Sequence, residues 1–139
     1  AALYMDKSGD KATGSRAGNN ISTGRAGEAF AARFLEGEGY RILETNYRRR
    51  LGEIDIIAMD KDTVVFVEVK TRRKDGFGTP GEAVNERKRA RISRASSLYL
   101  AGNGIEGIEA RVDVVEVEFL KDGGFRARLL KDAFEVLEP

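Results

Sequence analysis

The chain has 139 residues, a length that suits one domain with a core large enough to need no disulfide and no structural metal. It contains no cysteine and no histidine, which excludes thiolate zinc sites, catalytic triads and histidine bases, so that any catalysis has to use carboxylates, lysine or a metal held by oxygen ligands. The formal net charge is +1, no segment approaches the ~20 apolar residues of a membrane span and none resembles a secretory signal, so we expect a cytoplasmic protein that does not enter a membrane.

The first third of the chain predicts a tail, a helix and a strand. Residues 1–23 are polar and rich in Gly, Ser, Asn and Lys, which predicts a flexible tail. Apolar residues at helical spacing then predict a helix over residues 23–36, which glycines end, and a strand follows over residues 40–47. A single folded domain is therefore expected over residues 24–139.

Residues 52–70 predict a β-hairpin at the centre of the fold. Residues 60–63 make the turn, so that Met59 lies opposite Val64. Near the turn both faces of the hairpin are apolar, which is typical of a strand pair that is covered on both sides. One face is expected to be apolar along its whole length, through Ile54, Ile56, Ala58, Val65, Val67 and Val69.

The open end of the same hairpin has acids and a lysine on its other face. The register places Asp55 opposite Glu68 and Glu53 opposite Lys70. The Cβ atoms of directly opposed residues lie about 4.5–5.5 Å apart, where like charges repel. The two facing carboxylates therefore need a compensating cation. One interpretation is a solvated patch in which Lys70 neutralises one carboxylate, and the other is a functional site.

The second half of the chain predicts one more helix and two strands. A glycine-rich loop over residues 75–81 contains Phe77, which either packs down or contacts a nucleic acid. The loop leads to a helix over residues 82–100, and alternating sequences predict strands over residues 111–120 and 125–130. The order α-β-β-β-α-β-β predicts one α/β domain with a mixed central sheet and helices on its faces.

Basic residues gather beside the acidic end of the hairpin. Residues 41–50 contain four bases and one acid, and residues 71–94 contain eight bases and three acids. The register also places Arg50 opposite Arg73 where the strands extend so far. A basic surface attracts polyanions whatever its fold, and the alternatives are a solvated surface, a docking site for an acidic protein or, on a helix, a snorkelling lysine. The candidate phosphate-binding residues are Arg48, Arg49, Arg50, Arg72, Arg73 and Lys88.

Asp55 and Glu68 have the spacing to hold a hard divalent cation such as Mg²⁺, with the Val69 carbonyl as a further ligand. Such an ion is bound by one or two carboxylates and keeps several waters. It polarises a phosphoryl oxygen and lowers the pKa of bound water. Lys70 points to the same face, where it would orient the attacking water and stabilise charge that builds on the phosphate. Acids that bind a metal, bordered by arginines that bind the backbone, suit phosphodiester cleavage.

Asp55, followed by Glu68-Val69-Lys70 on the next strand, resembles the PD-(D/E)XK motif of the restriction-endonuclease-like nucleases, with Ile54 in place of the proline. The order of elements resembles their shared core. The chain from about residue 24 to residue 130 is also similar to the YraN-like family of small bacterial proteins, which are functionally uncharacterised and related in fold to archaeal Holliday junction resolvases. The motifs that show this similarity are Gly27-Glu28, Gly52-Glu53-Ile54-Asp55, Val67-Glu68-Val69-Lys70-Thr71-Arg72 and Arg111-Val112-Asp113-Val114-Val115.

The resemblance implies roles for four residues of the candidate site. Asp55 and Glu68 would bind Mg²⁺ or Mn²⁺, and Lys70 would be the catalytic lysine. Glu28, on the first helix, would be an additional acid that reaches the metal directly or through water. Without the resemblance, Glu28 is better explained as a first-turn acid that the helix dipole stabilises.

Two further acids and the biological role have several interpretations. Glu53 is a ligand, a partner of Lys70 or an exposed acid, and Asp113 is expected to be structural and to pair with an arginine. The first functional hypothesis is a metal-dependent endonuclease that acts on structured or branched DNA. The alternative is a nucleic-acid-binding module of the same fold that cleaves nothing. A homodimer is compatible with the resemblance, because resolvase relatives act as symmetric dimers, but no residue identifies an interface.

Overall fold

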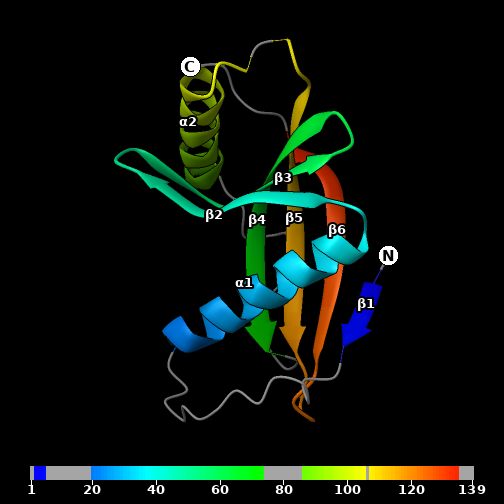
Figure 1. Ribbon diagram of the computed structural model, residues 1–139. Coiled ribbons are helices and arrows are strands. Elements are labelled where there is room, and N and C mark those ends of the chain that lie inside the picture. The colour runs from blue at the N-terminus through cyan, green and yellow to red at the C-terminus, as the bar shows by residue number, and fades with distance from the viewer. Residues whose placement is uncertain (1, 6–19, 74–85, 106, 135–139) are drawn as a thin grey trace.

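The computed structural model describes residues 2–5, 20–73, 86–105 and 107–134 (Figure 1). In chain order these residues form β1 (Ala2–Met5), α1 (Asn20–Gly37), β2 (Arg41–Arg49), β3 (Gly52–Asp60), β4 (Thr63–Arg73), α2 (Glu86–Gly102), β5 (Ala110–Phe119) and β6 (Phe125–Phe134). From α1 onward this is the predicted order α-β-β-β-α-β-β, so the α/β class is confirmed.

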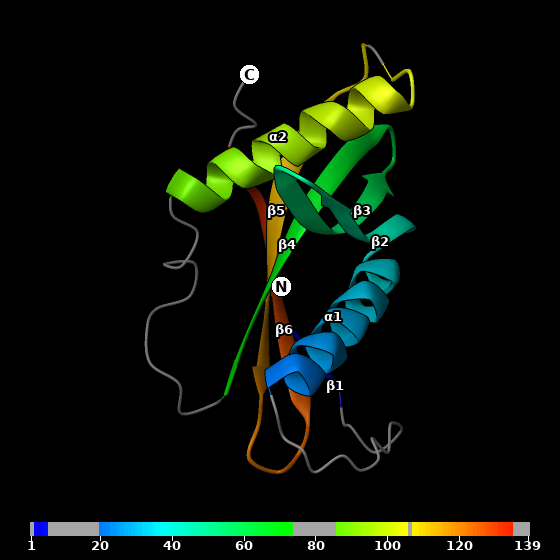
Figure 2. The same ribbon diagram turned by 90° about the vertical axis from the view of Figure 1, so that its left-hand side faces the viewer.

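The described strands form one sheet in the order β1-β6-β5-β4-β3-β2. β4 and β5 are parallel and α2 makes the crossover between them, whereas all other neighbouring strands are antiparallel. α1 lies across β4, β5 and β6, and α2 lies against β3 and β2 (Figures 1 and 2). The predicted mixed sheet with helices on its faces is therefore confirmed.

Each helix closes its own core against the central hairpin. Phe30 and Phe34 of α1 are fully buried and pack against Val65 and Val67 of β4. Three residues of α2 pack against the alternate set of hairpin residues; this second core contains Ile92, Ala95 and Tyr99 with Ile57, Val64 and Phe66. Both faces of the hairpin are buried near its turn, and for this reason the sequences of the two strands there are continuous runs of apolar residues.

The hairpin of β3 and β4 has the predicted register. Its backbone ladder begins at the turn and ends with Ile56 opposite Val67. Asp55 and Glu68 are therefore the first residues beyond the ladder, where the two strands are no longer joined by paired backbone groups.

Two pairs that were predicted further along this hairpin do not form. β3 continues beyond the ladder paired only with β2, so that Glu53 lies opposite Arg48 and not opposite Lys70. Arg50 lies in the turn between β2 and β3, and it is not opposite Arg73. The reason is that β3 twists away from β4 toward its other neighbour, as strands of a twisted sheet do.

Ile54 lies on the opposite face from the one predicted. It is 1% exposed and belongs to the core under α2, together with Tyr47, whereas Ile56 packs on the side of α1. The alternation changes next to Asn46 of β2, which has a left-handed backbone with φ of 54°. A residue in this conformation rotates the strand pair locally and changes the face that the following side chains occupy.

The chain ends differ partly from expectation. Ala2–Met5, within the segment predicted as a flexible tail, form β1, which pairs with β6 at the edge of the sheet. The helix α1 begins at Asn20, earlier than predicted. The division into tail and domain after residue 23 stays a prediction, and the loop over residues 75–81 lies outside the described residues. Neither helix in the described part of the chain is long and apolar enough to cross a bilayer.

Gly52, at the start of β3, lies directly against α2. A Cβ atom on this residue would lie 2.2 Å from the carbonyl oxygen of Arg91, so Gly52→Ala has to push β3 and α2 apart. We expect the free energy of unfolding, measured with urea, to fall by about 1–3 kcal/mol. Gly24→Ala in α1 is the control, since nothing lies within 4 Å of the added Cβ, and it should raise stability by about 0.5–1 kcal/mol. Equal stability of the two variants would contradict this close contact.

Candidate functional site

The carboxylate of Asp55 joins β3 to β4 at the point where the backbone ladder has ended. Its Oδ2 atom accepts a hydrogen bond of 2.8 Å from the backbone N–H of Val69. This bond fixes the carboxylate beside β4, next to Glu68. Burial raises the pKa of Asp55 above its ordinary value, although the bond from Val69 and the charge of Lys88 oppose the rise.

Glu68 is buried between two lysines. It is 4% exposed, and its Oε2 atom lies 2.5 Å from Nζ of Lys88 and 4.0 Å from Nζ of Lys70. Burial and the neighbouring charge of Asp55 raise the pKa of Glu68 to about 7, against the opposing effect of Lys88 and Lys70. The compensating cation that the two acids need is thus present, and it comes chiefly from Lys88 on α2 rather than from Lys70.

The two lysines have opposite pKa shifts. Burial and the neighbouring Lys88 lower the pKa of Lys70. Burial also acts to lower the pKa of Lys88, but the hydrogen bond and the charge of Glu68 outweigh it, so that this pKa is raised. Lys88 is therefore the firmly held ammonium of the pair, whereas Lys70 releases a proton more readily than an exposed lysine does.

The donor set fits a hard divalent cation. Asp55 and Glu68 supply two carboxylates side by side, which is the number that Mg²⁺ uses when it keeps several waters. A cation on Glu68 requires Lys88 to move away from Oε2. In the part of the chain that the structure describes, no three acidic side chains come close enough together to hold one metal ion. Glu28 therefore does not lie close enough to Asp55 and Glu68 to bind the same metal ion directly.

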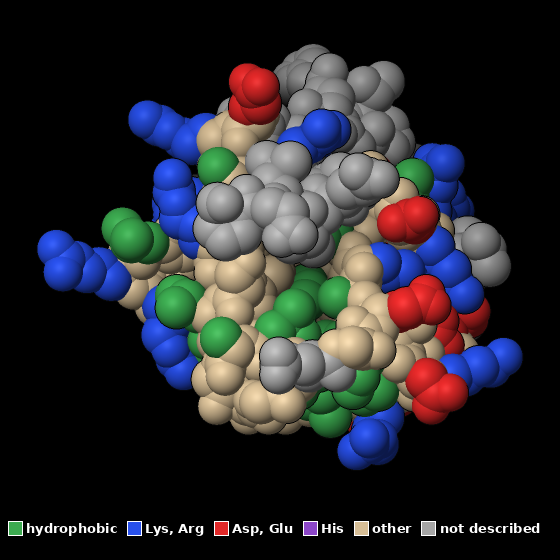
Figure 3. Space-filling view, turned by 90° about the horizontal axis from the view of Figure 1, so that it is seen from above, with side chains coloured by type: hydrophobic (Ala, Val, Ile, Leu, Met, Phe, Trp, Pro, Cys, Tyr) green, Lys and Arg blue, Asp and Glu red, His purple; other side chains and the backbone are tan. Residues whose placement is uncertain are grey.

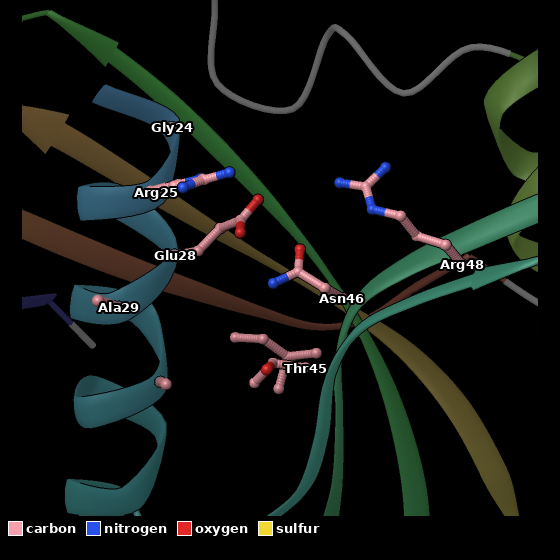
Figure 4. Close-up of a pocket in the computed structure, with 9 residues that line it drawn as sticks. Gly24, Arg25, Glu28, Ala29, Thr45, Asn46 and Arg48 are labelled. Atoms are coloured by element: carbon pink, nitrogen blue, oxygen red, sulfur yellow. The ribbon is translucent and has the colours of Figure 1, made fainter. Parts of the chain in front are cut away.

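Glu28 lies on the wall of a groove between α1 and β2 (Figure 4). Burial and the charge of Asp55 raise the pKa of Glu28, so the two acids influence each other. The first turn of α1 contains no acid, because the helix begins at Asn20; the explanation of Glu28 as a first-turn acid is therefore wrong. A role for Glu28 at the metal, through water, stays a prediction. The groove has a volume of about 990 Å³ and is lined by Gly24, Arg25, Glu28, Ala29, Ala32, Thr45, Asn46, Arg48 and Ile56.

Glu53 of β3 forms ion pairs with arginines of two neighbouring elements, β2 and α2. Its carboxylate accepts bonds from Arg48 at 2.7 Å and from Arg91 of α2 at 3.1 Å. Among the roles considered for Glu53, a partner of Lys70 does not fit these contacts, whereas a role as a metal ligand stays a prediction. Arg48 keeps a side chain that is 64% exposed despite its ion pair, so it remains able to reach a ligand.

The other predicted phosphate-binding residues lie at two places. Arg49 stacks on the ring of Tyr47 at 4.0 Å, and Arg50 lies at the turn after β2. Arg72 and Arg73 end β4. Figure 3 shows basic side chains along the left margin, the side on which Figure 1 places the turn between β2 and β3. A second groove, of about 410 Å³, joins this turn to α2 and is lined by Arg50, Leu51, Arg87, Ala90, Arg91 and Arg94.

Asp113 is structural, as predicted. It is fully buried, accepts a hydrogen bond of 2.8 Å from the hydroxyl of Tyr40, and pairs with Nε of Arg111 at 2.9 Å. Because all these groups satisfy one another away from Glu68, the network stabilises the sheet and takes no part in the candidate site.

Two residues that line the groove, Arg25 and Asn46, were not among the predicted site residues. Arg25 lies on α1, outside the two segments whose bases were counted. Asn46 had one available signal, because asparagine is depleted in strands and enriched in left-handed backbone. An asparagine inside a predicted strand therefore deserved attention as an irregularity.

The chain matches a family of known proteins over most of its length. The model of a family described as "Uncharacterised protein family UPF0102" matches residues 27–117. A UPF0102 protein from Syntrophus aciditrophicus is 56% identical over 117 residues, which cover 84% of this chain and 91% of the relative. UPF0102 proteins from Alkaliphilus oremlandii and Acetivibrio thermocellus are 52% and 49% identical, over 73% and 84% of this chain and 89% and 93% of the relatives. These names assign no activity.

The raised pKa of Glu68 predicts how stability depends on pH. The folded protein binds this proton more tightly than the unfolded chain, so stability is lost as the pH rises from 4.5, the ordinary value, to about 7. We expect Glu68→Gln to be more stable than wild type by about 1–3 kcal/mol at pH 8 in urea unfolding, and by much less at pH 5. Glu36→Gln, an exposed acid of α1, is the control. A Gln variant that is less stable at pH 8 would contradict the argument.

Proposed function

Because the chain belongs to the uncharacterised protein family UPF0102, whose name assigns no activity, we propose from the geometry of the site that it is a metal-dependent endonuclease acting on DNA. The family is the YraN-like family that the sequence motifs indicated. Its proposed reaction is the hydrolysis of phosphodiester bonds with Mg²⁺ or Mn²⁺. Structured or branched DNA is the substrate class that the resemblance to Holliday junction resolvases implies.

The observation that supports this proposal most directly is the pairing of two carboxylates, one buried and one partly buried, with two lysines. Asp55 is held beside Glu68 by the bond from Val69, and Nζ atoms of Lys70 and Lys88 face Glu68. A purely structural ion pair needs one acid and one base. Two neighbouring acids with raised pKa values are an unfavourable arrangement that is typical of catalytic and metal-binding sites.

The residues of this chain would divide the work as follows. Asp55 and Glu68 would hold the ion once Lys88 has left Oε2, and the bound ion would supply a water of lowered pKa and polarise the phosphate. Lys70, on the strand of Glu68, would orient the attacking water and stabilise the negative charge that develops on the phosphate. The arginines beside the groove would hold the backbone of the DNA.

A second candidate function is a nucleic-acid-binding module that does not cleave. The contact between Lys88 and Glu68 favours it, because this ammonium already neutralises a carboxylate without any metal. Both candidates predict salt-sensitive binding to DNA. They differ in one respect. Only the endonuclease predicts metal-dependent cleavage that is lost when Asp55 or Lys70 is replaced.

Cleavage assays on a labelled four-way junction, a flap, single strands and linear duplex at low salt decide between them. With Mg²⁺ or Mn²⁺ we expect cleavage by the wild type, and we expect Asp55→Asn and Lys70→Ala each to lower the rate by about 100-fold or more. Asp62→Asn and Lys121→Ala, at exposed turns, are matched controls that should cleave normally.

Two results would contradict the endonuclease. Tight binding without cleavage, unchanged in Asp55→Asn, would favour the binding module. Weak binding to every DNA even at low salt would instead indicate that the arginines dock an acidic protein.

A further inference from the structure

Asn46 has an unusual backbone at a single position of β2. Its φ of 54° is left-handed, a conformation that is strained for residues other than glycine and mildest for asparagine and aspartate. The register is the same directly on either side of it, with Thr45 opposite Ile56 and Tyr47 opposite Ile54, and a separate bulge lies earlier in β2 between Ile42 and Glu44. No residue is inserted between these two pairs, so the left-handed conformation falls on Asn46, which the register places opposite Asp55.

The side chain of Asn46 is exposed and lies between the walls of the groove. Figure 4 shows it between Glu28 of α1 and Arg48 of β2, pointing toward α1. Its carboxamide makes no hydrogen bond with any residue that the structure describes. A strained backbone therefore presents unused hydrogen-bonding groups next to the carboxylate pair.

The charges that line this groove favour an anion. Arg25 comes from α1 and Arg48 from β2, on opposite walls, and Glu28 is the only acid among the described residues of the lining. The volume of about 990 Å³ is near the upper end of the range for ligand-binding pockets, about 300–1,000 Å³. Ile56, the residue after Asp55, is part of the lining, so that a chain bound in the groove would pass near the carboxylates.

We propose that this groove binds the nucleotide next to the phosphodiester that is cut, and that Asn46 is a further residue in contact with substrate. Arg25 and Arg48 bind backbone phosphates from opposite walls, and the Asn46 carboxamide donates and accepts hydrogen bonds with the nucleotide between them. This inference rests on the proposed function, because it takes nucleic acid as the ligand. It adds to that function the path of the nucleic-acid strand along the groove and the contact with Asn46. Neither of these depends on the metal.

A purely conformational role for Asn46 makes a different prediction. Glycine adopts positive φ without strain, so Asn46→Gly keeps the backbone conformation and removes the side chain with its carboxamide. If asparagine is present for its backbone alone, the glycine variant binds DNA as the wild type does. If the side chain contacts substrate, the glycine variant folds normally and binds more weakly.

The test is fluorescence anisotropy with a labelled four-way junction and the matching linear duplex, at low salt and in EDTA so that nothing is cleaved. We expect Asn46→Gly to bind about 3- to 10-fold more weakly, the effect of one or two lost hydrogen bonds, with unchanged or higher thermal stability. Lys61→Gly is the matched control: Lys61 also has a positive φ, of 59°, but lies at the exposed turn between β3 and β4. Its DNA affinity should equal that of the wild type.

The arginines on the walls of the groove are tested by the salt dependence of DNA binding. Arg25→Ala should lower the slope of log affinity against log salt by about 1, the loss of one phosphate contact, whereas Lys121→Ala at the exposed turn between β5 and β6 should not. Wild-type affinity in Asn46→Gly, or an unchanged salt slope in Arg25→Ala, overturns the inference while leaving the proposed hydrolysis intact. If the groove variants weaken binding but no metal supports cleavage, the inference stands and the endonuclease fails.

Discussion

The hydrogen bond from the backbone of Val69 to the Asp55 carboxylate is the constraint on which the site depends. The ladder between β3 and β4 ends with Ile56 opposite Val67, and beyond it this bond joins the two strands. It places Asp55 next to Glu68 at the position where like charges repel. Burial raises both pKa values, and the charge of Asp55 raises that of Glu68 further, so the arrangement lowers the stability of the fold and needs positive charge to persist.

That positive charge comes from two elements that are separate in the sequence. Lys70 is on β4, beside Glu68, but the closer ammonium belongs to Lys88, on the crossover helix α2. The site therefore exists only when the hairpin and α2 are packed together, which Gly52 permits by letting the backbone of α2 approach β3. In the proposed reaction the ammonium of Lys88 would leave Glu68, and the two carboxylates would then hold the metal ion. The same contact makes the pair tolerable in the protein without metal.

Much of this could be predicted from the sequence because strand geometry is periodic. A polar turn and strict alternation fix which residues of a hairpin face each other, and this is sufficient to bring Asp55 to Glu68. The face of Ile54 could not be predicted, because it depends on the left-handed backbone of Asn46, a choice that alternation does not encode. The position of Lys88 depends on how α2 packs. β1 is a run of only four residues that pairs with β6 at a sheet edge, and so short a run does not identify its distant partner.

The most direct test of this account is a crystal structure of the protein soaked in Mn²⁺, with data collected at the manganese absorption edge. The account predicts an anomalous peak between the carboxylates of Asp55 and Glu68, with the ammonium of Lys88 moved away from Oε2 and the bond from Val69 to Asp55 retained. A structure in which Lys88 stays on Glu68 and no peak lies between the two acids, at a Mn²⁺ concentration that supports occupancy, would contradict it. The carboxylate pair would then be a structural ion cluster.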